Sequence, residues 1–195
     1  MSNNSNYFEV EFEENLNNSK KEFDSSFESE ISSLSIEDNN IINIVNSINL
    51  VLTELVEINN KNENNLNSNE NDIFNSKSIP NISILDYLNR IIEFSNIEEN
   101  TLIAGLIYIN KIEKIIKITK YNIHKILFSC ILIAIKIFED HIYSNDFFAQ
   151  IAGIQKEELL QLELNISILL DFKFFICEQF FEQFKEALIL MNNNL

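Results

Sequence analysis

The sequence predicts an all-α fold. Apolar residues recur three or four positions apart over residues 36–58 and through most of the chain after Pro80, which is the period of a helix with one buried face. Only two glycines and one proline occur among the 195 residues. Glycine supplies the positive φ angles of tight hairpin turns, so its scarcity argues against a hairpin-rich all-β fold.

The part of the chain before Pro80 divides into three predicted segments. Residues 1–35 mix Asn, Ser and acidic residues without periodicity and predict a disordered acidic tail, whose four phenylalanines could also form a short docking motif. Residues 36–58 predict an amphipathic helix that begins after Ser35. Residues 59–78 are rich in Asn and predict a low-complexity linker.

Six further helices are expected after Pro80. Ser95 and Glu98 form a capping-box pair for the second of them, Thr119 can cap the third and Ser144 the fourth. The third is apolar on nearly all sides, so we expect it to be the central, buried helix. The expected helices cover residues 82–94, from the Ser95 cap to about 115, 121–139, 144–153, 156–170 and 177–191.

Composition excludes several classes of protein. Gly105 and Gly153 lie too far apart for a glycine-rich phosphate loop, and neither belongs to a nucleophile elbow. The chain carries 30 acidic residues against 14 basic ones, a net charge of −16, and Arg90 is its single arginine. Residues 1–78 contribute −11 and residues 79–195 contribute −5. Such a chain would be repelled by nucleic acid and by anionic membrane surfaces.

Targeting signals and cysteine usage predict an intracellular protein of the cytoplasm, the nucleus or both. The first residues lack the basic and apolar regions of a signal peptide. The longest apolar stretch, residues 126–138, is shorter than the roughly 20 residues of a membrane span. Cys130 and Cys177 cannot form a disulfide framework, which fits a reducing compartment.

Residues for catalysis or metal binding do not cluster in the sequence. His124, His141, Cys130 and Cys177 show no ligand spacing, so we expect no metal site and no cofactor. Cys130 lies in an apolar helix, where burial makes a thiol inert. The acidic pairs are adjacent residues, which point apart on a helix. We therefore expect a protein that is not an enzyme.

Two groups of charges call for an explanation. Lys136 and Glu163 each stand inside an apolar helical stretch, where an unpaired charge is costly. They form either an ion pair with each other or a site for an external partner. The second group surrounds one helix junction and either complements a helix dipole or docks an acidic or phosphorylated partner. Its members are Lys111, Lys114, Lys117, Lys120 and Lys125.

The chain from residue 79 to residue 174 resembles the cyclin box, and specifically the single-box P/U-type cyclins related to the yeast phosphate-pathway cyclin. The family's motifs occur here in order and with the family's spacing. They read PNISILDYLNRI at 80–91, YINK at 108–111, NIHKIL at 122–127, AIKIFED at 134–140, YSNDFFAQIAGI at 143–154 and LE at 162–163.

The resemblance implies a fold and a function. It implies a five-helix cyclin box within a domain at 79–191, with a preceding N-terminal helix and a C-terminal helix. It also implies a regulatory subunit that forms a heterodimer with a cyclin-dependent kinase and activates it, box helices 3 and 5 packing on the kinase C-helix. Lys136 and Glu163 match the cyclin pair that bonds the backbone around that helix. The implied apolar contacts are Ile133, Ile137, Phe172 and Phe174.

Two departures from the family pattern favour an alternative. Asn110 and Lys111 replace an Asp-Arg pair, and Ser167 stands where an apolar kinase contact is common. The hydrophobic docking motif of cell-cycle cyclins is not evident at 83–86, and the chain contains neither an R-x-x-L nor a K-E-N degradation signal. The alternative is a helical scaffold or pseudo-cyclin adaptor that binds a partner without activating a kinase.

Overall fold

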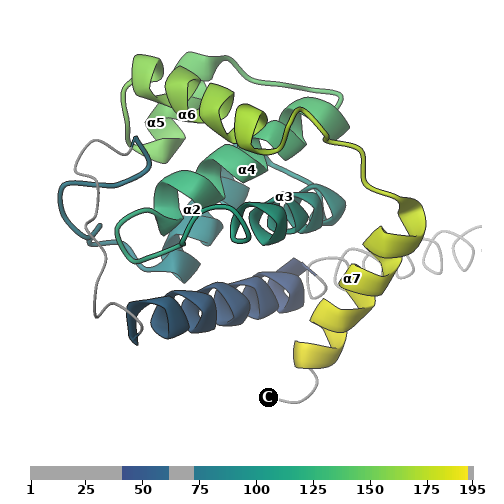
Figure 1. Cartoon of the computed structure of the whole chain (residues 1–195). Coiled ribbons are helices and arrows are strands. Elements are labelled where there is room, and N and C mark those ends of the chain that lie inside the picture. The colour runs from purple at the N-terminus through teal and green to yellow at the C-terminus, as the bar shows by residue number, and fades with distance from the viewer. Residues whose placement is uncertain (1–40, 62–72, 193–195) are drawn as a thin grey trace, which may run out of the picture. The chain divides into compact units, whose positions relative to one another are not determined.

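The computed structural model describes residues 41–61 and 73–192 (Figure 1). These residues form seven helices and no strand, so the all-α prediction is confirmed. The predicted tail at 1–35 lies outside the described residues. The first helix is Ile41–Lys61. The others are α2 (Ile84–Ser95), α3 (Glu99–Ile112), α4 (Ile123–Phe138), α5 (Asn145–Ala152), α6 (Lys156–Leu169) and α7 (Glu178–Asn192).

The core is built around α3 and α4. Of the 16 residues of α4, 11 are buried, and this helix contacts α2, α3, α5 and α6 (Figure 1). In α3, 10 of the 14 residues are buried. The third expected helix is therefore central, and α3 shares that position because nearly every residue from Thr101 to Ile112 is covered.

Gly105 allows α3 and α4 to approach each other closely. A Cβ atom at this position would lie 2.9 Å from Ile131 Cγ1 and 3.2 Å from Ile131 Cα. Real Cβ contacts are almost never that short, so any larger residue must push the two helices apart. Glycine is used here for space, since no unusual φ angle is involved.

Replacing Gly105 with Val is expected to lower the free energy of unfolding by about 2 kcal/mol, because overpacking a tight helix contact strains both helices. Urea denaturation followed by circular dichroism measures this change. Gly153→Ala is the control: its Cβ would meet nothing within 4 Å, and its cost of about 1 kcal/mol comes only from the positive φ of 71°. If Gly105→Val and the unmodified chain unfold at the same urea concentration, the contact between α3 and α4 at Gly105 is not tight.

Two serines begin helices as N-caps. The backbone N–H of Phe147 donates to Ser144 Oγ at 3.3 Å, so the predicted cap of α5 is confirmed. This helix ends at Gly153, which adopts the left-handed conformation. Ser83 Oγ accepts from the N–H of Asp86 at 3.0 Å, so α2 begins two residues later than expected.

Two other predicted caps are wrong. Ser95 is the last residue of α2, and its hydroxyl donates back to the carbonyl of Ile91 instead of capping α3. A serine hydroxyl can donate to the carbonyl four residues earlier in a helix. Here α2 continues as far as Ser95, which is buried, so its hydroxyl makes this bond. The N-cap of α3 is Glu98, without a side-chain bond.

Thr119 begins a turn and not a helix. Its Oγ1 accepts from the N–H of Tyr121 at 3.3 Å, while its own N–H donates to Asn122 Oδ1 at 2.7 Å. These local bonds complete a turn, so α4 begins at Ile123, two residues later than predicted.

The N-terminal helix ends later than predicted and is bonded to the rest of the domain; residues 36–40 of the predicted helix lie outside the described part of the chain. It continues to Lys61, where residue 58 was the expected end. Ser47, fully buried, donates to the carbonyl of Leu188 in α7 at 2.9 Å. Asn59 Nδ2 donates to the carbonyl of Ile118 at 2.9 Å. The buried apolar residues of helix Ile41–Lys61 are Ile44, Val45, Ile48, Leu52 and Val56.

By length and composition alone, helix Ile41–Lys61 could also cross a membrane. Core helices of soluble proteins meet the same criteria, and five apolar residues of this helix are buried in the domain.

The predicted linker at 59–78 is too long at both ends. Residues 59–61 belong to the helix, and residues 73–76 lie against the core. Phe74 is buried, and Lys125 Nζ donates to the carbonyls of Ile73 and Asn75 at 3.2 and 3.3 Å. An aromatic anchor and a lysine from α4 thus fix this segment. Residues 62–72 lie outside the described part of the chain.

Candidate functional site

Lys136 and Glu163 form a bidentate ion pair between α4 and α6. The Lys136 Nζ atom lies 2.6 Å from Glu163 Oε1 and 2.8 Å from Oε2. The side chains keep 26% and 21% of their surface exposed. The pair therefore lies at the protein surface, partly shielded, where it remains within reach of another molecule.

Apolar side chains that face solvent accompany this pair. Leu160, Leu164 and Ile168 recur every four residues, so they share the outer face of α6. Ile137 follows Lys136 on α4, and Phe172 follows the end of α6. We call these five residues and the ion pair the α4–α6 patch. The exposed fractions of its apolar members are Ile137 42%, Leu160 41%, Leu164 48%, Ile168 55% and Phe172 60%.

Exposed apolar side chains that lie close together are typical of surfaces that bind other proteins. Leu160, Leu164 and Ile168 are not among the contacts expected from the sequence. A signal was present: α6 carries apolar residues on more sides than one buried face requires. In such a helix the outer apolar residues indicate a second contact.

Two residues that the resemblance implied as contacts are less accessible than expected. Ile133 is only 4% exposed. It lies one turn before Ile137 on α4 and belongs to the core, and its contact with a kinase stays a prediction. Phe174 is half-buried, with its ring centroid 6.2 Å from that of Tyr108 and 6.2 Å from that of Phe172. Ser167 is also buried, and its hydroxyl donates to the carbonyl of Glu163 at 2.8 Å.

The lysine cluster is spread over several environments. Lys125 pairs with Glu158 at 2.8 Å. Lys111 lies against Tyr108, with its Nζ 5.5 Å from the ring centroid, and its pKa is lowered by burial. Lys114 is exposed and Lys117 is half-buried. Docking of an acidic partner by Lys111, Lys114 and Lys117 stays a prediction.

The described residues offer little for catalysis or metal binding. Within 41–61 and 73–192, no three His, Cys, Asp or Glu side chains are grouped to hold a metal ion. Burial raises the pKa of the Cys130 thiol far above its usual range. His124 Nε2 donates to the carbonyl of Ile82 at 2.9 Å, and burial lowers the pKa of this imidazole. Both side chains therefore stay uncharged at neutral pH and serve packing.

The described residues form an all-α domain whose α4–α6 patch combines an ion pair with exposed apolar side chains. Residues 15–174 match the family model described as Cyclin. The chain belongs to the cyclin family.

Known relatives agree with this family and with the P/U type. Cyclin-U1-1 of Arabidopsis thaliana is 31% identical over 114 residues, which are 57% of this chain and 54% of that protein. The PHO85 cyclin-like protein psl1 of Schizosaccharomyces pombe is 32% identical over 121 residues, 60% of this chain and 50% of that protein. The chain thus spans about half the length of the curated relatives it matches.

Proposed function

We propose that the chain is the regulatory subunit of a cyclin-dependent kinase, which it binds and activates through the α4–α6 patch. The observation that carries the proposal is the bidentate pair of Lys136 and Glu163 within an exposed apolar surface. The name of the fission-yeast relative supports a kinase of the PHO85 type. We further propose that the heterodimer is intracellular.

The ion pair suits the recognition of a helix end. An ammonium group has three donors, and Glu163 takes two of those of Lys136, so one donor remains. The carboxylate oxygens keep free lone pairs. A docked backbone can therefore donate to Glu163 and accept from Lys136. These added bonds offset the desolvation of the pair and fix the register of the two proteins.

Activation would follow from where the kinase C-helix is held. In protein kinases, a Glu on this helix must reach the Lys of strand three to complete the ATP phosphate site. Apolar contacts from Leu164, Ile168 and Phe172 would bury one side of that helix, and the ion pair would set its rotation. Binding thereby favours the active arrangement of a two-state element.

Mixing the purified chain with a PHO85-type kinase should give a one-to-one complex in analytical ultracentrifugation. The expected dissociation constant is in the micromolar range or tighter, as for a regulatory interface of standard size. Two separate sedimenting species at tens of micromolar would contradict the proposed function.

The alternative is a pseudo-cyclin adaptor that binds without activation. It is favoured by Asn110 and Lys111, which replace the family's Asp-Arg pair. It predicts the same complex in the ultracentrifuge but an unchanged rate of phosphate transfer. A kinase assay on the purified complex therefore distinguishes the two functions.

A further inference from the structure

The chain turns sharply after α6 through two left-handed residues. Asp171 and Phe172 have φ angles of 54° and 52°, although neither is a glycine. The N–H of Asp171 donates to the carbonyl of Ile168 at 2.8 Å, and that of Phe172 donates to the carbonyl of Ser167 at 2.9 Å. This is the hydrogen-bond pattern of a Schellman cap, in which glycine is usual at the position of Asp171.

The left-handed conformation is unfavourable for these side chains. Asp tolerates it moderately well, because its short polar side chain bonds locally, but a bulky aromatic residue seldom adopts it. Two such residues in succession persist only when surrounding contacts hold them. The ion pair of Asp171 with Lys173, at 2.7 Å, is largely exposed and contributes little.

Tyr108 of α3 contacts the segment that follows this turn. Its hydroxyl donates to the carbonyl of Phe174 at 2.8 Å, and its ring meets that of Phe174 edge to face. Burial raises the pKa of Tyr108 to about 12, so the hydroxyl remains a donor at physiological pH. Lys111, one turn further along α3, lies over the Tyr108 ring and places its Nζ 3.4 Å from the carbonyl of Lys173.

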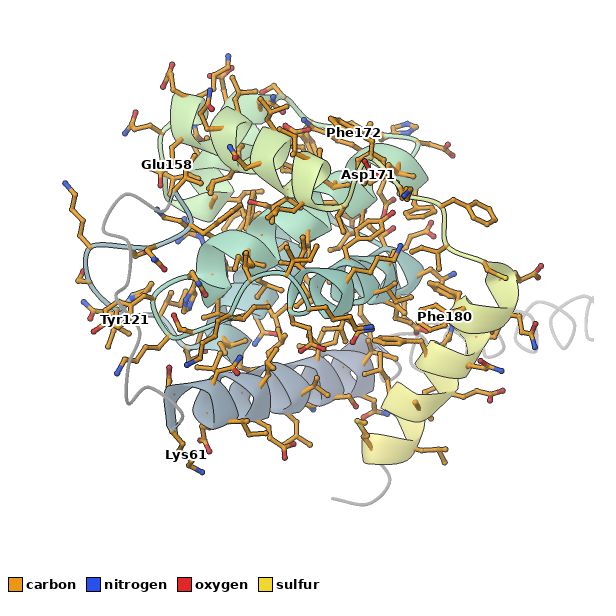
Figure 2. All side chains as sticks on the ribbon, in the orientation of Figure 1. Lys61, Tyr121, Glu158, Asp171, Phe172 and Phe180 are labelled. Carbon is orange, nitrogen blue, oxygen red and sulfur yellow. The ribbon has the colours of Figure 1, made fainter. Side chains whose placement is uncertain are left out.

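Phe172 lies beside this contact and is linked to it through Phe174. Its ring stands edge to face against that of Phe174, with centroids 6.2 Å apart, and 60% of its surface is exposed. Figure 2 shows Asp171 and Phe172 together at the end of α6. A line of contacts thus runs from Tyr108 through Phe174 to Phe172, a member of the α4–α6 patch.

We propose that Tyr108, assisted by Lys111, is a positioning residue that holds the segment 171–174 in its left-handed turn and so fixes Phe172 for partner binding. This role rests on the proposed function, since a kinase is the partner that Phe172 would meet. Tyr108 itself stays beneath the surface and touches no partner.

Tyr108→Phe tests the proposal by removing one oxygen atom. In the full chain, amide hydrogen exchange of a peptide covering residues 170–176 is expected to accelerate about tenfold, because local opening becomes easier. Dissociation of a PHO85-type kinase, followed by surface plasmon resonance, is expected to accelerate severalfold, while the association rate stays within about twofold. Lys111→Met keeps the aliphatic part of the side chain. It should accelerate amide hydrogen exchange of the same peptide by less than Tyr108→Phe does.

Tyr87→Phe is the matched control. Tyr87 is also buried, and its hydroxyl also donates to a backbone carbonyl, that of Ala152, at 3.3 Å. This variant is expected to lose some stability without changing exchange at 170–176 or kinase dissociation. A merely structural role for Tyr108 predicts that the two variants behave alike.

Three results would overturn the proposal. Unchanged exchange at 170–176 in Tyr108→Phe refutes the holding contact. Faster exchange with unchanged kinase dissociation refutes the positioning role. Absence of kinase binding by the unmodified chain refutes the proposed function and the positioning role with it, and the exchange data then still show whether Tyr108 holds the turn.

Discussion

Replacing Lys136 with Glu is expected to abolish association with the kinase while the chain remains helical. The substitution places a second carboxylate beside Glu163, where the ammonium group now lies at 2.6 Å. The variant lacks the ammonium donor that a docked backbone carbonyl would need. The two carboxylates also repel each other, which weakens the binding surface further. Because truncating a buried, bonded charge pair at an interface costs about 2–5 kcal/mol, affinity should fall by at least about 30-fold. Isothermal titration calorimetry measures the affinity, and circular dichroism measures the helix content.

The double variant Lys136→Glu/Glu163→Lys provides the control. It restores an ion pair between α4 and α6, so its thermal stability should return towards that of the unmodified chain. Its donor and acceptor are exchanged, however, so kinase binding should not recover. Unchanged binding in Lys136→Glu would exclude the α4–α6 patch as the interface.

Replacing Ile168 with Asp is expected to reduce kinase binding by about 10- to 100-fold, because a carboxylate would be desolvated in the apolar part of the contact. Ile168 is 55% exposed on the outer face of α6, so the free chain tolerates the charge in water. The melting temperature should therefore change little. Binding is measured by the same calorimetric titration.

Ile115→Asp is the control for this second variant. Ile115 is likewise 55% exposed but lies in the turn after α3, outside the α4–α6 patch. The same chemical change at the same exposure should leave binding intact. Similar losses in both variants would mean that added negative charge, and not position on the patch, weakens the complex.

Much of the fold follows from the sequence because helical periodicity is a local property. The apolar period shows where the helices lie, and short polar residues such as Ser144 show where one begins. The same signal is ambiguous where a residue has two local partners. Ser95 could cap the next helix or donate to the preceding turn of its own helix. Because α2 packs against the core as far as Ser95, the hydroxyl donates to the carbonyl of Ile91.

The site was predictable in part. Lys136 and Glu163 stand out because each interrupts an apolar stretch, and the structure joins them. The burial of Ile133 and the exposure of Leu164 depend on how α6 lies against α4, which periodicity does not determine. The bond from Tyr108 to Phe174 joins residues 66 positions apart and leaves no pattern in the sequence.

Activation is tested by the rate of phosphate transfer of a PHO85-type kinase, measured while the purified chain is added. We expect the rate to rise with the concentration of the chain and to saturate at one chain per kinase, and we expect no rise with Lys136→Glu. A saturable complex whose rate equals that of the kinase alone would contradict activation and indicate an adaptor.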